Sequence, residues 1–316
     1  METSKSKIFY SILLIIAAFI WGLAYVFQSM ANNYLGAYSI TFFRCVVAII
    51  VLIPLVIVSC RKQFKENKEN KANIIKYSIL GGIFSGIFLA LASIFQQLGL
   101  KGTSTGKGAF MGSTYIILVP ILSFLIFRKK CGINSLIAII FGIVGLLFLC
   151  IDNFSFNSGL SKEEIYFLLC AVCFAFQIIC IDFFASKSNL FLMSLFQMIS
   201  CGLICMIMMF INEKVEFENI KNCIVPILYL GILSSGIAYT IQVISQKHIN
   251  PTTASLIMSL ESVFSCLCGV IIYTFYKFTD VDQYLTTNQI IGCVLLFIGV
   301  IISQIQFNFK KKERSK

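Results

Sequence analysis

Ten long apolar runs follow one another along this chain, separated by short polar connectors. A helix needs about 20 mostly apolar residues to cross a bilayer, and each run is close to that length. The runs cover residues 8–28, 38–59, 74–98, 107–127, 134–151, 163–185, 189–211, 223–246, 252–276 and 287–306. This pattern predicts an all-α integral membrane protein with ten transmembrane helices.

Composition excludes the main alternatives to this fold class. Of the 316 residues, 58% are hydrophobic and 12% are charged, whereas soluble domains have roughly 45–50% and about 25%. Lipid cannot satisfy backbone hydrogen bonds, so spanning segments are helices or barrel strands, and the runs lack the alternation of barrel strands. The ten runs leave no room for a separate soluble ATPase or receptor domain.

Basic residues are distributed unevenly over the connectors. Of the 25 Lys and Arg residues, 18 lie at the termini or on connectors of the same side, six lie on the opposite side, and Arg44 lies within a run. Because basic residues collect in the cytoplasm, both termini are expected there, in a multi-pass protein of the plasma (cytoplasmic) membrane. The basic segments also suit anionic lipid or a partner, but a nucleic-acid partner is not expected.

A weak internal duplication divides the chain into residues 1–152 and 153–316. A shift of about 150 positions matches Leu80-Gly81 with Leu230-Gly231, Ser85-Gly86-Ile87 with Ser235-Gly236-Ile237, and Gln96 with Gln246. Each half has five spans, an odd number, so the second half must cross the membrane in the opposite direction. We therefore expect two inverted five-helix repeats, the plan of many secondary transporters.

Two ionisable residues lie inside the runs and need an explanation, because a central charge costs about 2.5–3.5 kcal/mol on insertion scales. Glu261 lies near mid-membrane, without a cation nearby in sequence, and suits either a proton-coupling site or a site for a substrate amine. It also suits a role in helix packing. Arg44 suits an anchor for a carboxylate or phosphate, an architectural ion pair, or a side chain that reaches the interface.

Polar and aromatic residues at helical spacing indicate a cavity. Side chains four, seven and eleven positions apart share a helix face, which groups Trp21 with Tyr25 and Gln28, and Ser235 with Tyr239, Gln242 and Gln246. Pro54 and Pro120 are expected to kink their helices. The candidate cavity residues are Trp21, Tyr25, Gln28, Arg44, Ser85, Phe88, Gln96, Tyr115, Phe176, Gln177, Tyr239 and Gln242, with Glu261 as the candidate for proton coupling.

No pattern indicates an enzyme, a metal or a cofactor. The chain has one histidine, His248, and no HExxH sequence, and residues 102–106 (GTSTG), which fit GxSxG, follow an apolar run and not a strand. Most of the 13 cysteines lie in apolar runs, where they act as small hydrophobic residues, and the Cys170/Cys173 pair lacks further clustered ligands. No catalytic residue is therefore assigned.

Several strings resemble EamA-type members of the drug/metabolite transporter superfamily. They are AAFIWGLAYVFQ and FFRCVVAII near the start, LKGTSTGKGAFMGSTYIILVPILSFL in the fourth run, and SGIAYTIQVISQKHINPTTASLIMSLESVFSCLCGVIIY in the eighth and ninth. Trp21-Gly22, Arg44, Tyr115 and Pro120 match recurring family positions. Glu261 matches the Glu of the family's Glu-Pro pair, although this chain has Ser262 in place of the proline.

The resemblance implies a ten-helix secondary transporter that moves small metabolites, often amino acids and often outward. Phe88 and Phe176 stand where some aromatic amino acid exporters of this family have aromatic side chains. The expected function is therefore transport of small metabolites by alternating access, with a small-molecule substrate, the lipid bilayer as partner, no cofactor, and one chain sufficient. A passive facilitator or channel for small polar solutes is the alternative.

Overall fold

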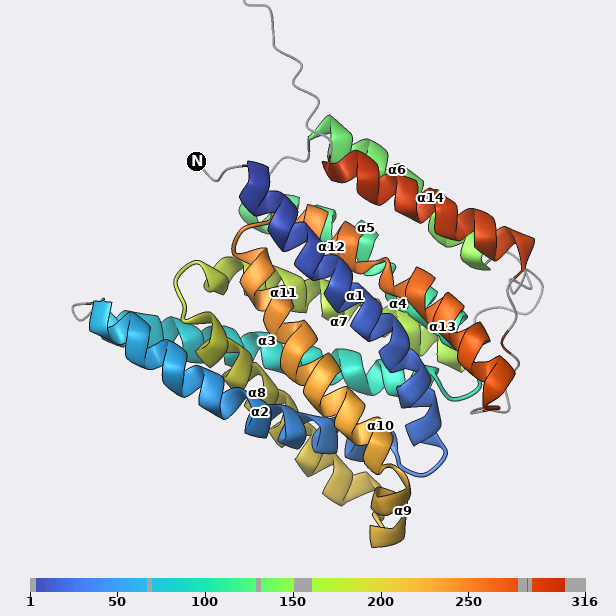
Figure 1. Cartoon of the computed structure of the whole chain (residues 1–316), viewed down its shortest axis with the longest axis horizontal. Helices are drawn as coiled ribbons and strands as arrows, with labels where there is room; N and C mark the ends of the chain where they lie inside the picture. The colour runs from blue at the N-terminus through green and yellow to red at the C-terminus, as the bar shows by residue number, and fades with distance from the viewer. Residues whose placement is uncertain are drawn as a thin grey trace, which may run out of the picture.

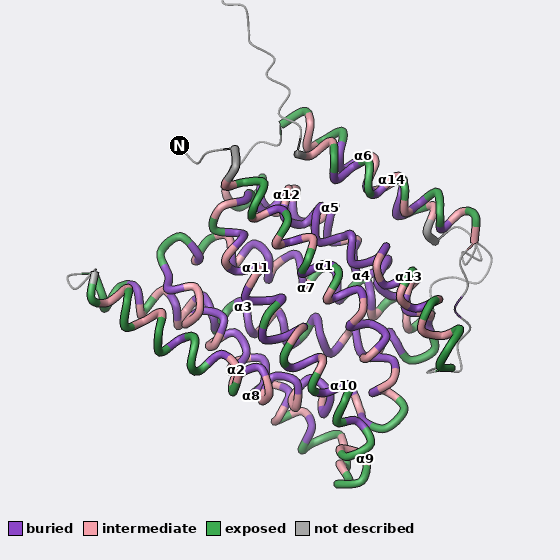
Figure 2. Tube along the Cα trace, in the orientation of Figure 1, coloured by how far each residue is buried: buried purple, intermediate pink, exposed green. Residues whose placement is uncertain are grey.

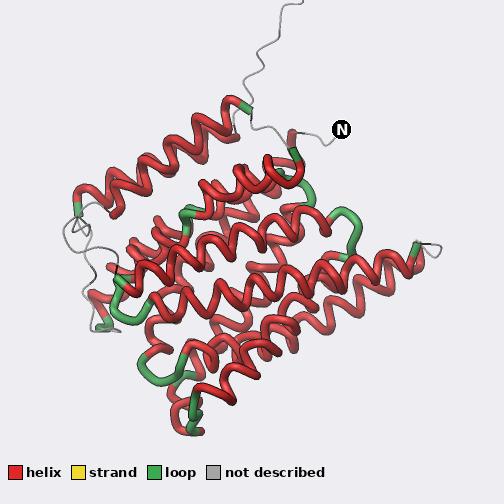
Figure 3. The backbone as a smooth tube through the Cα atoms, turned by 180° about the vertical axis from the view of Figure 1, so that it is seen from behind, coloured by secondary structure: helices red, strands yellow, loops and turns green. Residues whose placement is uncertain are grey.

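The computed structural model describes residues 4–66, 70–128, 132–150, 161–277, 283 and 286–304. Within these ranges every regular element is a helix (Figure 3). Eight helical stretches have the length and apolar composition needed to cross a bilayer: Ser6–Asn32, Ala37–Lys65, Lys71–Gly99, Thr105–Phe127, Lys162–Ala185, Leu190–Asn212, Ile224–Gln246 and Pro251–Phe275. The prediction of an all-helical membrane protein is confirmed for the described chain.

The apolar runs fold into helices that pass back and forth between two ends of a bundle. Described turns at 33–36 and 100–104 lie at one end, and those at 186–189 and 247–250 lie at the other (Figure 1). The helices of the first half are α1 (Ser4–Asn32), α2 (Ala37–Glu66), α3 (Lys71–Gly99), α4 (Thr105–Gly112), α5 (Tyr115–Phe127) and α6 (Ile133–Cys150).

The second half has more, shorter elements. They are α7 (Lys162–Ala185), α8 (Leu190–Asn212), α9 (Phe217–Asn222), α10 (Ile224–Leu228), the π-helix η2 (Tyr229–Ala238), α11 (Tyr239–Gln246), α12 (Pro251–Met258), α13 (Glu261–Phe275) and α14 (Thr287–Gln304). Helices α6 and α14 correspond to the fifth and tenth predicted runs and are shorter than the other spans.

The core lies where helices of the two halves meet. Helix α3 packs against α7 and α8, α1 packs against α13 and η2, and α2 packs against α8. Helices α6 and α14 pack against each other at one edge of the bundle and expose much of their surface (Figures 1 and 2). The buried residues therefore concentrate in the eight longer spans, around the interface between the halves.

Two spans are interrupted in the same way. Helix α4 has eight residues after its N-cap Ser104, and α12 has eight residues after its N-cap Asn250. Each is followed by a two-residue break and then by a second helix, which begins at Tyr115 in one span and at Glu261 in the other. Every one of these features in the second span lies 146 positions after its counterpart in the first.

The prolines are not the sites of these interruptions. Helix α2 continues through Pro54 and α5 continues through Pro120. The fourth span is instead broken at Ser113 and Thr114, where the Ser113 hydroxyl donates to the carbonyl of Ala109 at 2.8 Å. A side-chain bond of this kind satisfies a carbonyl group near the end of a helix, which is where irregular backbone needs a partner.

Helices α3 and α8 approach closely because glycines face the contact. A β-carbon at Gly82 would lie 2.7 Å from the carbonyl oxygen of Met193 and 2.9 Å from the amide nitrogen of Gln197, both backbone atoms. A substitution there cannot be accommodated by rotating a side chain alone. Small residues at helix contacts have this function in membranes.

The Gly82→Ala variant is expected to lose about 1–3 kcal/mol of stability, because the added methyl group overpacks the α3–α8 contact. The melting temperature of the detergent-purified protein measures this loss. Gly132→Ala is the control, since nothing lies within 4 Å of a β-carbon at that position. Equal melting temperatures for the two variants would show that this contact tolerates a wider helix spacing.

Candidate functional site

Glu261 occupies the break in the ninth span, and its carboxylate faces the break in the fourth. The side chain is 6% exposed, and its Oε1 accepts hydrogen bonds from the Ser113 hydroxyl at 3.3 Å and the Tyr115 hydroxyl at 3.2 Å. Glu261 is the first residue of α13, where the helix dipole favours a negative charge. The two breaks thus form one polar junction inside the protein.

Arg44 brings a positive charge to the same interior from α2. Its side chain is 3% exposed, and Nη2 donates to the hydroxyl of Ser93 on α3 at 2.5 Å. No carboxylate of the described residues lies within 4.0 Å of the guanidinium group. Since arginine keeps its proton in proteins, this charge is buried with one neutral partner and an unpartnered Nε.

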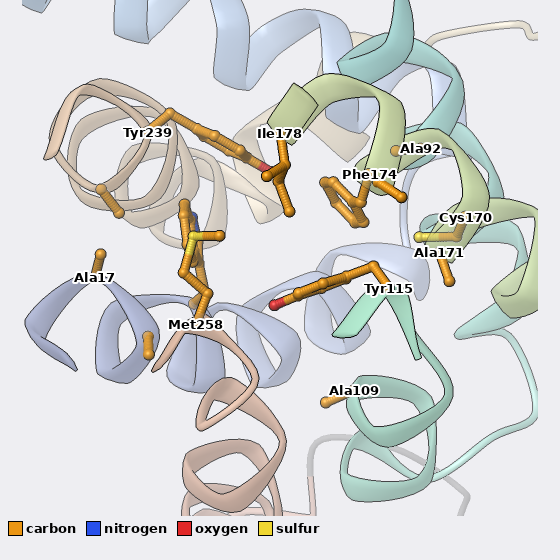
Figure 4. Packing of buried hydrophobic residues seen from close by; sticks show 14 of the residues in the cluster. Ala17, Ala92, Ala109, Tyr115, Cys170, Ala171, Phe174, Ile178, Tyr239 and Met258 are labelled. Carbon is orange, nitrogen blue, oxygen red and sulfur yellow. The ribbon is translucent and has the colours of Figure 1, made fainter. Parts of the chain in front are cut away.

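A cavity with about 410 Å³ of empty space, open solvent included, lies between the two halves. Seven of its lining residues come from the first half and eight from the second, and all fifteen are buried. In Figure 4, Tyr115 and Tyr239 extend from opposite sides toward the region between Phe174, Ile178 and Met258. The lining residues are Trp21, Ala24, Tyr25, Gln28, Arg44, Gln96, Tyr115, Phe174, Gln177, Ile178, Ser234, Tyr239, Gln242, Met258 and Glu261.

Amide and phenol groups in the cavity wall are paired in two similar sets. In the first half, Gln96 Nε2 on α3 donates to the Tyr25 hydroxyl on α1 at 2.7 Å. In the second half, Gln177 on α7 and Gln242 on α11 exchange hydrogen bonds of 3.2 and 3.1 Å. These pairs fix the side chains, because each satisfied bond in a buried site removes alternative orientations.

The structure brings ten of the thirteen candidate site residues together in this cavity. They are Trp21, Tyr25, Gln28, Arg44, Gln96, Tyr115, Gln177, Tyr239, Gln242 and Glu261. The helical spacing of the polar residues predicted most of them. Side chains that helical spacing places on one helix face lie on the same cavity wall.

The other three candidates lie outside the cavity. Ser85 is buried between α3 and α8, where its hydroxyl donates to the carbonyl of Gly81 at 2.6 Å and lies 3.3 Å from the Gln197 side-chain oxygen. Phe88 and Phe176 stack on each other with ring centroids 5.2 Å apart, half-buried between α3 and α7. These residues face neighbouring helices because their positions on the helix turn them away from the cavity.

Sequence reasoning missed five lining residues: Ala24, Phe174, Ile178, Ser234 and Met258. Phe174 lies three positions before Gln177 and four before Ile178, so helical spacing places it on a face with each of them. Phe176, two positions from Phe174, lies on a different face. No signal in the sequence distinguishes Ser234 and Met258 from other small or apolar residues.

The described residues contain no group of three or more His, Cys, Asp or Glu side chains arranged to hold a metal ion. Cys170 is buried and Cys173 is half-buried on α7, both as free thiols. The Lys107 ammonium and the Glu164 carboxylate form an ion pair of 2.9 Å outside the cavity, between α4 and α7. The charged lining residues of the cavity are therefore Arg44 and Glu261.

The Glu261→Gln variant is expected to keep the melting temperature of the wild type within a few degrees, because the amide oxygen still accepts from Ser113 and Tyr115. The Glu261→Leu variant leaves the Tyr115 hydroxyl without that acceptor, whereas Ser113 keeps its bond to the Ala109 carbonyl, and it is expected to lose about 1–3 kcal/mol. Thermal unfolding in detergent compares the two. If both variants were destabilised equally, the junction would depend on the charge and not on the hydrogen bonds.

Comparison with known proteins agrees with this architecture. A solved crystal structure resembles the chain with a TM-score of 0.67 at 14% identity, covering 93% of this chain and 96% of the other, which shows a shared fold. An uncharacterized transporter of Archaeoglobus fulgidus is 24% identical over 93% of this chain and 85% of its own length. The uncharacterized transporter YoaV of Bacillus subtilis is 19% identical, over 92% and 95% respectively.

A chloroplastic WAT1-related protein of Arabidopsis thaliana is 22% identical over 90% of this chain and 66% of its own length. Two of these three relatives are named as transporters, and none is named as an enzyme. The EamA-like transporter family matches the sequence twice, over residues 8–151 and 161–304. The chain therefore belongs to the EamA-like transporter family, as a multi-pass membrane transporter with no enzymatic role.

Proposed function

We propose that this protein is a secondary transporter that moves small polar metabolites, amino acids or related compounds in particular, out of the cell by alternating access. The observation that carries the proposal is the cavity between the halves, which both halves line and whose wall contains one buried cation and one buried carboxylate. Intramembrane ionisable residues mark substrate or ion pathways. The cavity is lined within one chain, so a monomer suffices.

Two inverted five-helix repeats, residues 1–152 and 153–316, form the mechanical basis of this proposal. The helix contacts support it, because exchanging the halves maps them onto one another. Helix α3 packs on α7 as η2 and α11 pack on α1, and α4 packs on α13 as α12 packs on α5. Helices α6 and α14 complete the ten spans, since 18 residues extend about 27 Å and the hydrocarbon core is about 30 Å thick.

The register that supports the repeat differs from the sequence-based one. Gln96 and Gln242, which both line the cavity, lie 146 positions apart, whereas the sequence comparison paired Gln96 with Gln246. Before that point, Gly86 faces the Gln197 carbonyl and Gly231 faces the Arg44 carbonyl, a separation of 145. The π-helix η2 accounts for the extra residue, because a π turn holds more residues than an α turn.

Both termini face the cytoplasm in this proposal, and the protein lies in the plasma membrane. Green fluorescent protein fused after Lys316 is expected to fluoresce, because it folds in the cytoplasm, while alkaline phosphatase at the same position stays inactive. A truncated fusion of alkaline phosphatase after residue 152 is expected to be active, because five spans precede it. Phosphatase activity from the full-length fusion would contradict the orientation.

Proteoliposomes loaded with unlabelled amino acid are expected to show saturable, trans-stimulated uptake of labelled amino acid. An alternating-access carrier exchanges its substrate in this way, whereas a passive channel does not show trans-stimulation. We also expect a pH gradient to drive net flux in the wild type and to have no effect in Glu261→Gln, because the amide cannot take up a proton. Normal pH-driven flux in Glu261→Gln would exclude Glu261 as the coupling residue, and unsaturable leak would favour the channel.

A further inference from the structure

The polar groups of the cavity fall into a satisfied set and an unsatisfied set. Gln96 pairs with Tyr25, and Gln177 pairs with Gln242. In contrast, Trp21 Nε1, Arg44 Nε and Gln28 Oε1 line the cavity and are buried without a hydrogen-bond partner; they are three of the seven such side-chain atoms among the described residues. Nearly all buried polar groups in native proteins have partners, so an unsatisfied set grouped around one cavity points to a ligand.

Two of the unsatisfied donors, Trp21 Nε1 and Arg44 Nε, line the same cavity and form a positive pole. The rings of Trp21 and Tyr239 are 4.9 Å apart, and Tyr239 lines this cavity as well. Arg44 is held in place by its bond to Ser93, which leaves Nε free. A guanidinium and an indole N–H in one cavity wall are suited to a carboxylate, because charge-assisted hydrogen bonds to arginine are among the strongest in proteins.

Glu261 forms the opposite pole. Both hydrogen bonds that its side chain accepts, from Ser113 and Tyr115, reach Oε1, so Oε2 accepts no bond from a described residue. Tyr239 lines the same cavity as both charged residues. Because Arg44 and Glu261 do not pair with each other, each charge can be compensated by a different end of one molecule.

The rest of the wall limits the side chain of that molecule. Ala24, Phe174, Ile178 and Met258 give an apolar surface, and no third charged residue lines the cavity. A charged side chain would have no opposite charge to meet.

We propose that the cavity binds an α-amino acid with an uncharged, largely apolar side chain in a single orientation, its carboxylate on Arg44 and Trp21 Nε1 and its ammonium on Glu261. This inference rests on the proposed function only in treating the cavity as the substrate site. Each pole recognises one charged group of the ligand. Removing that group from the ligand is therefore expected to weaken binding as much as removing the pole from the protein.

The fluorescence of Trp21 tests the proposal without transport, because it is the one tryptophan of the chain and it lines the cavity. The purified full-length protein is titrated with L-leucine, with the corresponding 2-hydroxy acid, which lacks the ammonium, and with 3-methylbutylamine, which lacks the carboxylate. In the wild type, leucine is expected to change the emission saturably, and each analogue is expected to bind at least tenfold more weakly.

The variants are expected to remove these preferences one at a time. Arg44→Gln should weaken leucine binding at least tenfold and leave the affinity for the amine unchanged. Glu261→Gln should weaken leucine binding and leave the affinity for the hydroxy acid unchanged. Arg44→Lys and Glu261→Asp keep the charges and should keep the discrimination, which covers the case in which a neutral variant fails to fold. Lys107→Gln and Glu164→Gln remove matched charges outside the cavity and should change leucine binding less than about twofold.

Two results would overturn the orientation. The poles would not be the recognition groups if Glu261→Gln weakened binding of the hydroxy acid as much as binding of leucine. The same would follow if Arg44→Gln weakened binding of the amine as much as binding of leucine. If neither leucine, methionine nor phenylalanine bound the wild type while counterflow moved another solute, the amino acid inference would fail and the transport function would stand. An absence of counterflow for any solute would instead remove the proposed function.

Discussion

The structure depends on the fact that lipid offers no hydrogen-bond partner, so a spanning helix can be interrupted only where protein surrounds the break. Both interruptions in the described chain, between α4 and α5 and between α12 and α13, satisfy this condition. Serine side chains bond back to nearby carbonyls, from Ser113 to Ala109 at 2.8 Å and from Ser259 to Leu256 at 2.7 Å. The breaks are also where a carboxylate enters the interior, since Glu261 begins α13.

The same constraint explains why the two charges of the cavity are informative. A guanidinium cannot be neutralised by losing its proton, so Arg44 stays charged in a site that gives it one hydroxyl partner. Burying a charge without compensation is costly, and the nearest remedy would be an ion pair with Glu261. The fold does not make that pair, and it holds both side chains through neutral hydroxyl groups instead. In the proposed function, a bound substrate compensates the charges of both side chains.

Much of this arrangement could be predicted from the sequence because it follows from the length of the apolar runs and from helical spacing. Apolar length located the helices, and spacings of three, four and seven placed Trp21, Tyr25, Gln28, Tyr239 and Gln242 on cavity walls. Features that depend on helix phase were not predicted. The fourth span breaks at Ser113, Phe174 and not Phe176 lines the cavity, and the span at 224–246 contains a π-helix. Such irregularities are decided by contacts between distant helices, which local sequence does not contain.

The two halves are alike in backbone and unlike in chemistry, and the difference has a functional consequence. Tyr115 and Glu261 hold corresponding positions, each the first residue after a break and 146 positions apart. If both were carboxylates, the cavity would carry two negative sites, and the ammonium group of a substrate could bind at either. With tyrosine on one side, the hydroxyl donates to the single carboxylate and fixes it. The repeat would thus supply two alternative backbone arrangements, while its broken chemical symmetry keeps the orientation of the bound molecule the same in both.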